Sequence, residues 1–221
     1  MWSFFVLTVA LFVLVAVRAD EHPDCHFWAD SGECESNPGY MLSSCADACA
    51  KRAQETAAPP AANVPASLYE IVETDIQGEP LPMSSFEGKV LYIVNVASYC
   101  GYTADNYEMF RKLKPYREQG FEILLAPCNQ FGFQEPGDGT AITAFAQEKQ
   151  QFDGVSLSKA NVNGPEARPL FAYLKHVTGK QNIDWNFDGK FLVSRDGKVT
   201  HLAPGTDVER EVRELVGSGE L

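Results

Sequence analysis

Basic residues are scarce in this sequence of 221 residues, where 18 lysines and arginines stand against 30 aspartates and glutamates. They form no cluster that could follow a phosphate backbone, so we expect no nucleic-acid partner. The four histidines have no metal-ligand spacing, and we expect neither a metal nor a prosthetic group. Asn-X-Ser/Thr sequons are absent, which gives no sign of N-glycosylation.

Long apolar runs are equally scarce, and only residues 2–17 approach the length of a membrane span. This run is short for a span of about 20 residues and leads into the small-residue cleavage signature Val17-Arg18-Ala19. The arrangement predicts a signal peptide over residues 1–19. We therefore expect a protein of the secretory pathway, either secreted or retained in the endoplasmic reticulum lumen, because the final Glu-Leu pair is all that the C-terminus shares with a luminal retrieval signal.

The six cysteines fall into two groups. Four lie within residues 25–49, a segment too short to bury a large core alone, so disulfides are the expected staple. Spacing alone leaves all three possible pairings of these four open. The other two, Cys100 and Cys128, stand alone in the larger part of the chain.

The sequence motifs around the four cysteines of residues 25–49 resemble those of the ShKT family of small cystine-rich domains. The shared motifs are Trp28-Ala29, Gly32-Glu33-Cys34, Asn37-Pro38 and Tyr40-Met41. The family pattern has six cysteines, and the outer two, which pair with each other, are missing here; the resemblance thus implies the disulfides Cys25–Cys45 and Cys34–Cys49. Channel-blocking members carry a lysine directly before a tyrosine, and Tyr40 has none, so we expect a docking unit or spacer and not a toxin.

A stretch rich in alanine and proline, residues 51–66, has no apolar periodicity and predicts an extended linker. It separates the ShKT-like domain, residues 20–50, from a larger domain, residues 67–221. In the larger domain apolar strand patterns alternate with helical ones, which predicts a thioredoxin-like α/β fold with a central mixed sheet flanked by helices. The expected elements are strands at 89–97 and 121–128, helices at 103–119, 141–151 and 166–178, a hairpin around Asp196-Gly197 and a helix after residue 206.

Cys100 lies where the first expected strand gives way to a helix. A helix N-terminus favours the thiolate, which is the nucleophilic form of cysteine. A dithiol exchanger needs a second cysteine at position 103, which is Thr103 here, and a peroxiredoxin would have threonine at position 97, which is Ala97. A cysteine hydrolase would need a histidine base, and neither histidine of the larger domain is well placed for it.

Three sequence blocks decide between these chemistries. They read NVASYCG (residues 95–101), PCNQFGFQEPG (127–137) and WNF (185–187). Together they resemble the glutathione peroxidase family, in its cysteine form, and the similarity extends from about residue 67 to the last helix. The overall resemblance is closest to the endoplasmic-reticulum members, which implies a monomer. It also implies a catalytic tetrad of Cys100, Gln134, Trp185 and Asn186.

The residue types of this tetrad suit peroxide cleavage. The Cys100 thiolate would attack the distal oxygen of a hydroperoxide and become a sulfenic acid. The Trp185 indole only donates hydrogen bonds, and the Gln134 and Asn186 amides donate without titrating. Taken singly, Trp185 could be core filler, Asn186 a turn residue and Gln134 a solvated loop residue; their common register with Cys100 favours the catalytic interpretation.

The sequence leaves the reductant of the sulfenic acid open. Many relatives carry a resolving cysteine in an F-A-C run, which reads Phe145-Ala146-Gln147 here. In the endoplasmic-reticulum members the cysteine of PCNQFG resolves and disulfide isomerases reduce the product, so Cys128 is the candidate resolving thiol. The alternative is a buried structural cysteine at a strand end.

These features predict a thiol peroxidase that acts in the response to oxidative stress. The expected substrates are hydrogen peroxide and organic or lipid hydroperoxides, and the expected reductant is glutathione or a protein disulfide isomerase. The alternative is a peroxide sensor without turnover that docks through its ShKT-like domain.

Overall fold

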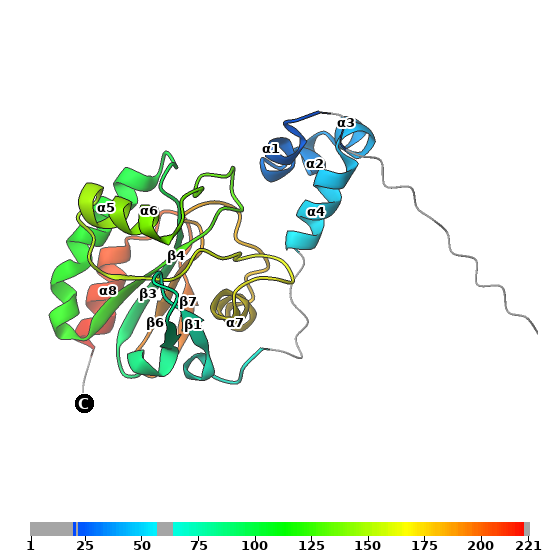
Figure 1. The fold of residues 1–221 in the computed structure, drawn as a ribbon. Helices are drawn as coiled ribbons and strands as arrows, with labels where there is room; N and C mark the ends of the chain where they lie inside the picture. Colours follow the sequence, from blue (N-terminus) through cyan, green and yellow to red (C-terminus); the bar gives the residue numbers. More distant parts are fainter. Residues whose placement is uncertain (1–19, 21, 57–63, 219–221) are drawn as a thin grey trace, which may run out of the picture.

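A computed structural model describes residues 20, 22–56 and 64–218. These residues form a helical unit, residues 22–56, and an α/β unit, residues 64–218 (Figure 1). The predicted signal peptide, residues 1–19, and residues 57–63 of the predicted linker lie outside the described residues. Within the described ranges, no helix is long and apolar enough to cross a membrane.

The helical unit is a small cluster of short helices held by disulfides (Figure 1). Its helices are α1 (Cys25–Asp30), α2 (Glu33–Ser36), α3 (Pro38–Ser44) and α4 (Ala46–Thr56). Cys25 is bonded to Cys45 and Cys34 to Cys49, which confirms the predicted pairing. Besides three of these cysteines, the buried core between the helices holds only Ala29, Met41 and Ala48 among the described residues, so the disulfides stabilise a unit whose apolar burial is small.

Helix α4 runs further than expected. Residues 51–56, predicted as the start of an extended linker, form its last turns. They read Lys-Arg-Ala-Gln-Glu-Thr, and all but the threonine are strong helix formers. Helix propensity therefore prevails over the missing apolar periodicity, and the extended conformation predicted for these six residues is wrong.

The α/β unit is built on a mixed sheet with the strand order β5-β4-β3-β6-β7. Its strands are β3 (Val90–Val96), β4 (Phe121–Pro127), β5 (Val155–Ser156), β6 (Lys190–Val193) and β7 (Val199–His201). Strands β3 and β4 are parallel with Val96 opposite Pro127, so both end at the same edge of the sheet. Strands β6 and β7 form the predicted antiparallel hairpin around Asp196-Gly197.

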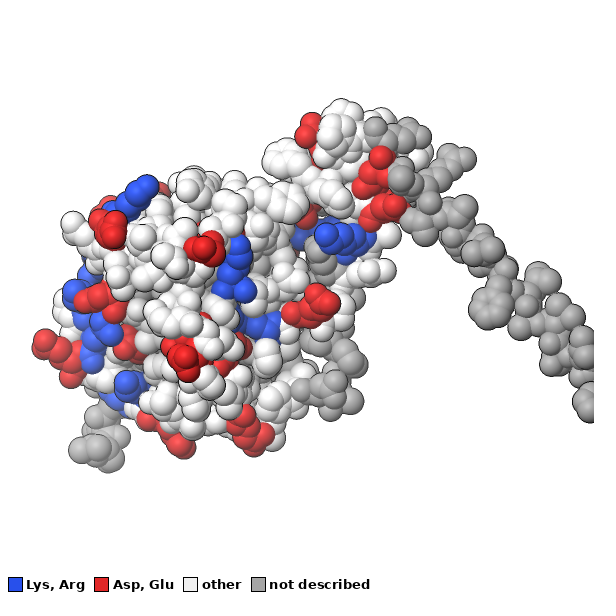
Figure 2. Space-filling view, viewed as in Figure 1, with Lys and Arg blue, Asp and Glu red and all other residues white. Residues whose placement is uncertain are grey.

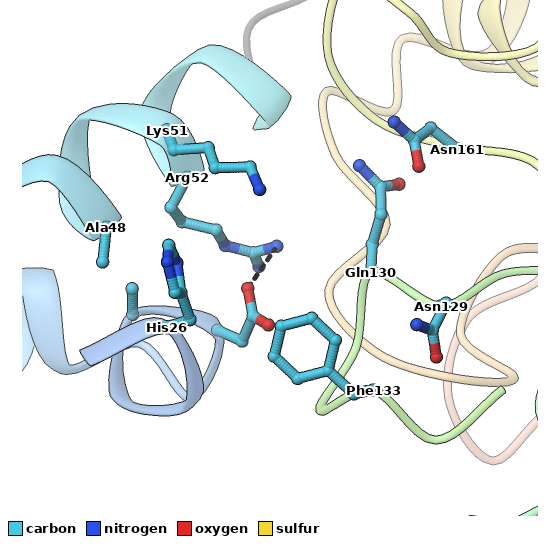
Figure 3. A pocket seen from close by; sticks show the side chains of 10 residues that line it. His26, Ala48, Lys51, Arg52, Asn129, Gln130, Phe133 and Asn161 are labelled. Atoms are coloured by element: carbon cyan, nitrogen blue, oxygen red, sulfur yellow. Dashed lines mark ion pairs between the residues drawn. The ribbon is translucent and has the colours of Figure 1, made fainter. Parts of the chain in front are cut away.

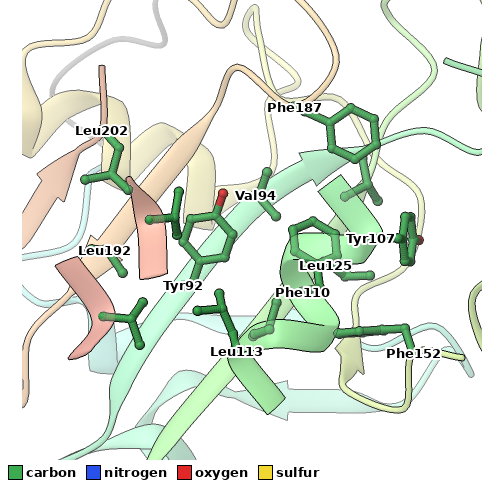
Figure 4. Packing of buried hydrophobic residues seen from close by; sticks show 14 of the residues in the cluster. Tyr92, Val94, Tyr107, Phe110, Leu113, Leu125, Phe152, Phe187, Leu192 and Leu202 are labelled. Carbon is green, nitrogen blue, oxygen red and sulfur yellow. The ribbon is translucent and has the colours of Figure 1, made fainter. Parts of the chain in front are cut away.

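Helices cover both faces of this sheet (Figure 1). Helices α5 (Thr103–Leu113) and α8 (Val208–Gly217) pack on one face, and α7 (Pro169–Thr178) packs on the other. Side chains of β3 alternate accordingly: Tyr92 and Val94 join the α5 and α8 cluster (Figure 4), while Leu91 and Ile93 join the α7 cluster. Burial on both faces explains the near-continuous apolar sequence of β3 and β4.

The connecting segments show where the expected boundaries shift. The elements that complete the unit are β1 (Val72–Thr74), β2 (Pro80–Pro82), α6 (Gly139–Ala144), a π-helical turn at Phe145–Lys149 and 3-10 helices at Leu68–Glu70, Met83–Phe86 and Lys114–Gln119. The α-helix predicted for residues 103–119 ends at Leu113 and continues as the 3-10 helix, because Pro115 has no N–H to donate to the carbonyl four residues before it. The helix predicted from residue 166 begins at Pro169, a residue suited to a first helical position.

Candidate active site

Cys100 sits in the loop between β3 and α5, and its side chain is nearly buried, at 9% exposure. Its backbone N–H donates to Thr103 Oγ1 at 3.2 Å, and that hydroxyl donates to the Ala97 carbonyl at 2.8 Å. Thr103 occupies the position where a dithiol motif would have its second cysteine. Here its hydroxyl stabilises the loop through these two hydrogen bonds. Because threonine has no thiol, dithiol exchange within this motif is excluded.

Gln134 and Asn186 meet directly, although 51 residues separate them in the chain. Asn186 Nδ2 donates to Gln134 Oε1 at 2.9 Å and lies 3.3 Å from the Phe131 carbonyl. Because the oxygen of the Gln134 amide is engaged in this way, its NH₂ group points elsewhere as a donor. The Tyr99 N–H donates to the Gln134 carbonyl at 3.0 Å, which fixes the Gln134 segment against the residue before Cys100.

Trp185 lies half-buried between the two core clusters and packs on Phe131, with 6.1 Å between ring centroids. The segment that carries it is held by Asn95, a fully buried polar residue in β3. Asn95 Nδ2 donates to the Trp185 carbonyl at 2.9 Å, and Asn95 Oδ1 accepts from the Gly189 N–H at 2.8 Å. This positioning residue was not predicted, and its only sign in the sequence is one asparagine inside an otherwise apolar strand.

Two of the site residues adjoin aromatic residues with left-handed backbone. Phe133, just before Gln134, has φ 55°, and Phe187, just after Asn186, has φ 63°. Such conformations cost about 1–3 kcal/mol each and persist only where the surrounding structure enforces them. The strain is concentrated on the segments that bring the two amides together.

Known proteins resemble this chain over most of the α/β unit. A protein of Mesembryanthemum crystallinum named "Probable phospholipid hydroperoxide glutathione peroxidase" is 43% identical over 162 residues, which cover 70% of this chain and 95% of the relative. The chain belongs to the glutathione peroxidase family. "Glutathione peroxidase 2" of Caenorhabditis elegans is 46% identical over 147 residues, 64% of this chain and 90% of that protein. These similarities make the protein a peroxidase, as the sequence predicted.

Family models account for both units. The model described as "Glutathione peroxidase" matches residues 68–175, which include Cys100 and Gln134 and end before Trp185. The model described as "ShK domain-like" matches residues 17–51. A solved structure, "Crystal structure of T. cruzi GPX1", is 34% identical with a TM-score of 0.55 and covers 70% of this chain and 99% of that chain. The fold of the glutathione peroxidase unit is therefore thioredoxin-like, as predicted.

A pocket of about 350 Å³ opens beside the site of this glutathione peroxidase. Trp185, Asn186 and Tyr102 line it, together with the start of α5 and the segment after β7. Three aromatic rings are exposed on the site loops: Tyr99 at 69%, Tyr102 at 60% and Phe133 at 51%. The entrance thus offers apolar surface as well as amide and indole donors.

Cys128 is fully buried directly after β4, and neither it nor Cys100 is in a disulfide. Its N–H donates to the Val96 carbonyl at 3.1 Å, and its sulfur lies 3.6 Å from Gln130 Oε1. Cys128 packs with the α7 cluster, whereas Cys100 packs with the cluster of α5 and α8 on the other face. The two sulfurs therefore belong to core clusters on opposite faces of the sheet.

A buried polar chain on the α7 face supports the segment before Trp185. Asn163 Nδ2 donates to the Ile183 carbonyl at 2.8 Å, and Asn163 Oδ1 accepts from the Ile183 N–H at 3.0 Å. Lys175 of α7, only 3% exposed, donates to the same Oδ1 at 3.2 Å. Burial lowers the pKa of Lys175 to about 8. These residues were not predicted to have a role, because polar residues in a loop and in a helix carry no local sign of their burial.

Glu135, next to Gln134, is a second buried ionisable residue, at 1% exposure. Burial raises the pKa of this carboxyl, while hydrogen bonds from Ser98 and the charge of Lys159 act in the opposite direction. Its backbone N–H donates to Asn129 Oδ1 at 2.8 Å. Glu135 therefore ties the Gln134 segment to the start of the Cys100 loop.

Proposed function

We propose that this glutathione peroxidase works through Cys100 as the peroxidatic residue, with Gln134, Trp185 and Asn186 as hydrogen-bond donors. The Cys100 thiolate attacks the distal oxygen of a hydroperoxide, the O–O bond breaks, and one proton goes to the departing oxygen. The products are a Cys100 sulfenic acid and water or an alcohol. The observation that carries the proposal is the Asn186–Gln134 hydrogen bond beside Trp185, joined to the Cys100 loop through Tyr99.

The donor set suits a reaction in which negative charge moves from sulfur to oxygen. Neutral N–H donors stabilise both the starting thiolate and the departing oxygen without losing a proton themselves. Asn186 and Gln134 hold each other in a fixed orientation, and Asn95 fixes the Trp185 backbone, so the donors are oriented before the peroxide arrives.

We propose organic and lipid hydroperoxides as substrates beside hydrogen peroxide. The exposed rings of Tyr99, Tyr102 and Phe133 support this, because an alkyl chain next to them would lose contact with water. The name of the Mesembryanthemum crystallinum relative, which refers to phospholipid hydroperoxide, agrees with this substrate class.

We propose an external thiol as the reductant, either glutathione or a disulfide isomerase of the secretory pathway. It would attack the sulfenic sulfur, form a mixed disulfide and release water, and a second thiol would restore Cys100. Cys128 is the intramolecular alternative to the first of these thiols. We also propose that the protein works as a monomer in the endoplasmic reticulum lumen or outside the cell, in the response to oxidative stress.

Steady-state peroxide consumption by the purified chain tests the role of Cys100. We expect the Cys100→Ser variant to lose turnover with every reductant, whereas Cys128→Ser, the matched control, keeps the first oxidation step. Unchanged turnover in Cys100→Ser would rule out the mechanism. Mass mapping after one equivalent of peroxide tests the role of Cys128: a Cys100–Cys128 linkage supports resolution by Cys128, and a persistent sulfenic acid opposes it.

The second candidate function is a peroxide sensor that docks through its helical unit. It is favoured by the exposed apolar side chains of that unit, Phe27 at 52%, Tyr40 at 43% and Leu42 at 62%. A sensor would pass its oxidation to a partner and show negligible steady-state turnover with small thiols and disulfide isomerases. Sustained turnover with either reductant excludes it.

A further inference from the structure

A small pocket of about 180 Å³ lies where the helical unit meets the α/β unit (Figure 3). The helical unit contributes His26 of α1 and Lys51 and Arg52 of α4. The α/β unit contributes Asn129 and Gln130 from the loop after β4, with Phe133 and Asn161. The pocket is smaller than the about 300 Å³ at which pockets begin to suit drug-sized ligands, so it fits one end of a small molecule.

The cationic wall of the pocket is built by α4. Arg52 lies 3.9 Å from Asp30 Oδ1, and its guanidinium carbon is 6.0 Å from the centroid of the Phe131 ring in the α/β unit. This cation–π approach links the two units at the pocket. Figure 3 shows Lys51 and Arg52 extending from α4 toward the α/β unit, on which Gln130 and Asn161 lie.

The opposite wall is held rigid by hydrogen bonds. Gln130 Oε1 accepts from the N–H groups of Val162 and Asn163 at 2.8 and 3.0 Å, and Gln130 Nε2 donates to the Asn163 carbonyl at 3.2 Å. Asn129 Oδ1 accepts from the Glu135 N–H, so the NH₂ group of Asn129 points away from Glu135. The amide wall therefore exists before any ligand enters.

The charge at the pocket selects the ligand. Lys51 and Arg52 place an ammonium and a guanidinium group at the pocket, next to the Asp30 carboxylate. Figure 2 shows blue basic side chains at this junction, with red acidic ones on either side. The planar guanidinium matches the two oxygens of a carboxylate, and the ammonium is a compact positive charge beside it.

We propose that this junction pocket binds the carboxylate of a small thiol, with Lys51 and Arg52 as its cationic partners and Asn129 and Asn161 as amide donors. The pocket adjoins the segment that carries one of the proposed donors, because Phe133 in its wall directly precedes Gln134. A peptide thiol such as glutathione, which carries carboxylates, is thereby held beside the site. The inference rests on the proposed function in one respect, that this thiol is the reductant of Cys100.

Binding of S-methylglutathione to the full chain tests the pocket without turnover, because this compound keeps the carboxylates and lacks the thiol. We expect Lys51→Gln and Asn161→Asp each to weaken binding about tenfold in calorimetry, the effect of losing one charge-assisted contact or adding one repulsive charge. The KM for glutathione should rise by a similar factor, while the rate of Cys100 oxidation by hydrogen peroxide stays unchanged. Lys198→Gln, an exposed lysine in the β6–β7 hairpin, is the matched control and should bind as the unmodified chain does.

Three results would overturn the proposal: no binding of S-methylglutathione, equal binding by all variants, or tighter binding of inorganic phosphate, which would indicate a general anion site. Arg52→Gln is a weaker test, since Arg52 also pairs with Asp30. The Cys100→Ser variant should still bind S-methylglutathione. If that variant binds and also keeps turnover, the peroxidatic role of Cys100 fails while the pocket stands.

Discussion

Replacing Lys175 with methionine should stabilise the protein at neutral pH. Lys175 is 3% exposed, its hydrogen-bond partner Asn163 is neutral, and burial lowers its pKa from 10.5 to about 8. Each pKa unit corresponds to 1.36 kcal/mol, so holding the ammonium charged costs the folded state about 3 kcal/mol. The substitution also removes the hydrogen bond from Lys175 to Asn163, which lowers stability by about 1 kcal/mol. We therefore expect the free energy of unfolding of Lys175→Met to be about 2 kcal/mol higher than that of the unmodified chain at pH 7.

The pH dependence of this difference gives the sharper test. Below pH 8 both the folded and the unfolded chain hold the proton, so the full cost is present. Between about pH 8 and 10.5 the unfolded state binds more protons than the folded state, so the free energy of unfolding of the unmodified chain rises with pH. The advantage of Lys175→Met should therefore shrink across this window.

Urea unfolding of both proteins at pH 7, 8, 9 and 10 measures the effect. Groups common to both proteins titrate equally and cancel in the difference. The exposed lysine variant Lys198→Met serves as the control and should show no pH-dependent difference from the unmodified chain. A gap between Lys175→Met and the unmodified chain that stays constant from pH 7 to 10 would refute the assignment of a buried, charged Lys175.

Two further predictions concern the buried ion pair and the indole donor. Arg168 and Glu73 are 2% and 4% exposed in their side chains and lie 2.7 Å apart, so Arg168→Met leaves a buried carboxylate and should lower the free energy of unfolding by about 3–5 kcal/mol in urea. The double variant Arg168→Met/Glu73→Gln should recover part of this loss, and an equally unstable double variant would contradict the argument. Trp185→Phe keeps an aromatic ring against Phe131 but removes the N–H donor, so sulfenic acid formation in stopped flow should slow by about 10²–10³-fold at unchanged stability. An unchanged rate would show that the indole is a packing residue only.

Much of the fold could be predicted because its signals are local. The apolar runs of β3 and β4, the helical spacing of Tyr107, Phe110 and Leu113 in α5, and the Asp196-Gly197 turn each specify an element within a few residues. Boundaries shifted where a second local signal competed, as at Pro115, where the α-helix ends early. The hairpin of β1 and β2 was not predicted, because its strands are three residues each and one begins and ends with proline.

In the candidate active site, too, residues with a local sequence signal could be predicted and residues that depend on distant contacts could not. The proposed reacting residues could be named from their motifs, but the residues that hold them could not. Asn95, Asn163 and Lys175 reach the Trp185 segment through contacts between distant parts of the chain, and the sequence does not show which polar residue will be buried. The pocket between the two units was also missed, since it depends on how α4 meets the loop after β4.

The positions of the two cysteines in the α/β unit bear on how a sulfenic acid at Cys100 would be reduced. Cys128 is fully buried on the α7 face, held by its backbone bond to Val96 and by its sulfur contact with Gln130. Because Cys128 packs in a different core cluster from Cys100, we expect resolution by Cys128 to cost the free energy of opening its loop. Cys100 lies between the exposed residues Tyr99 and Tyr102, and Tyr102 lines the pocket beside Trp185 and Asn186. A small thiol held at the junction pocket should therefore reach the oxidised sulfur first, and resolution by Cys128 should prevail only when that thiol is scarce.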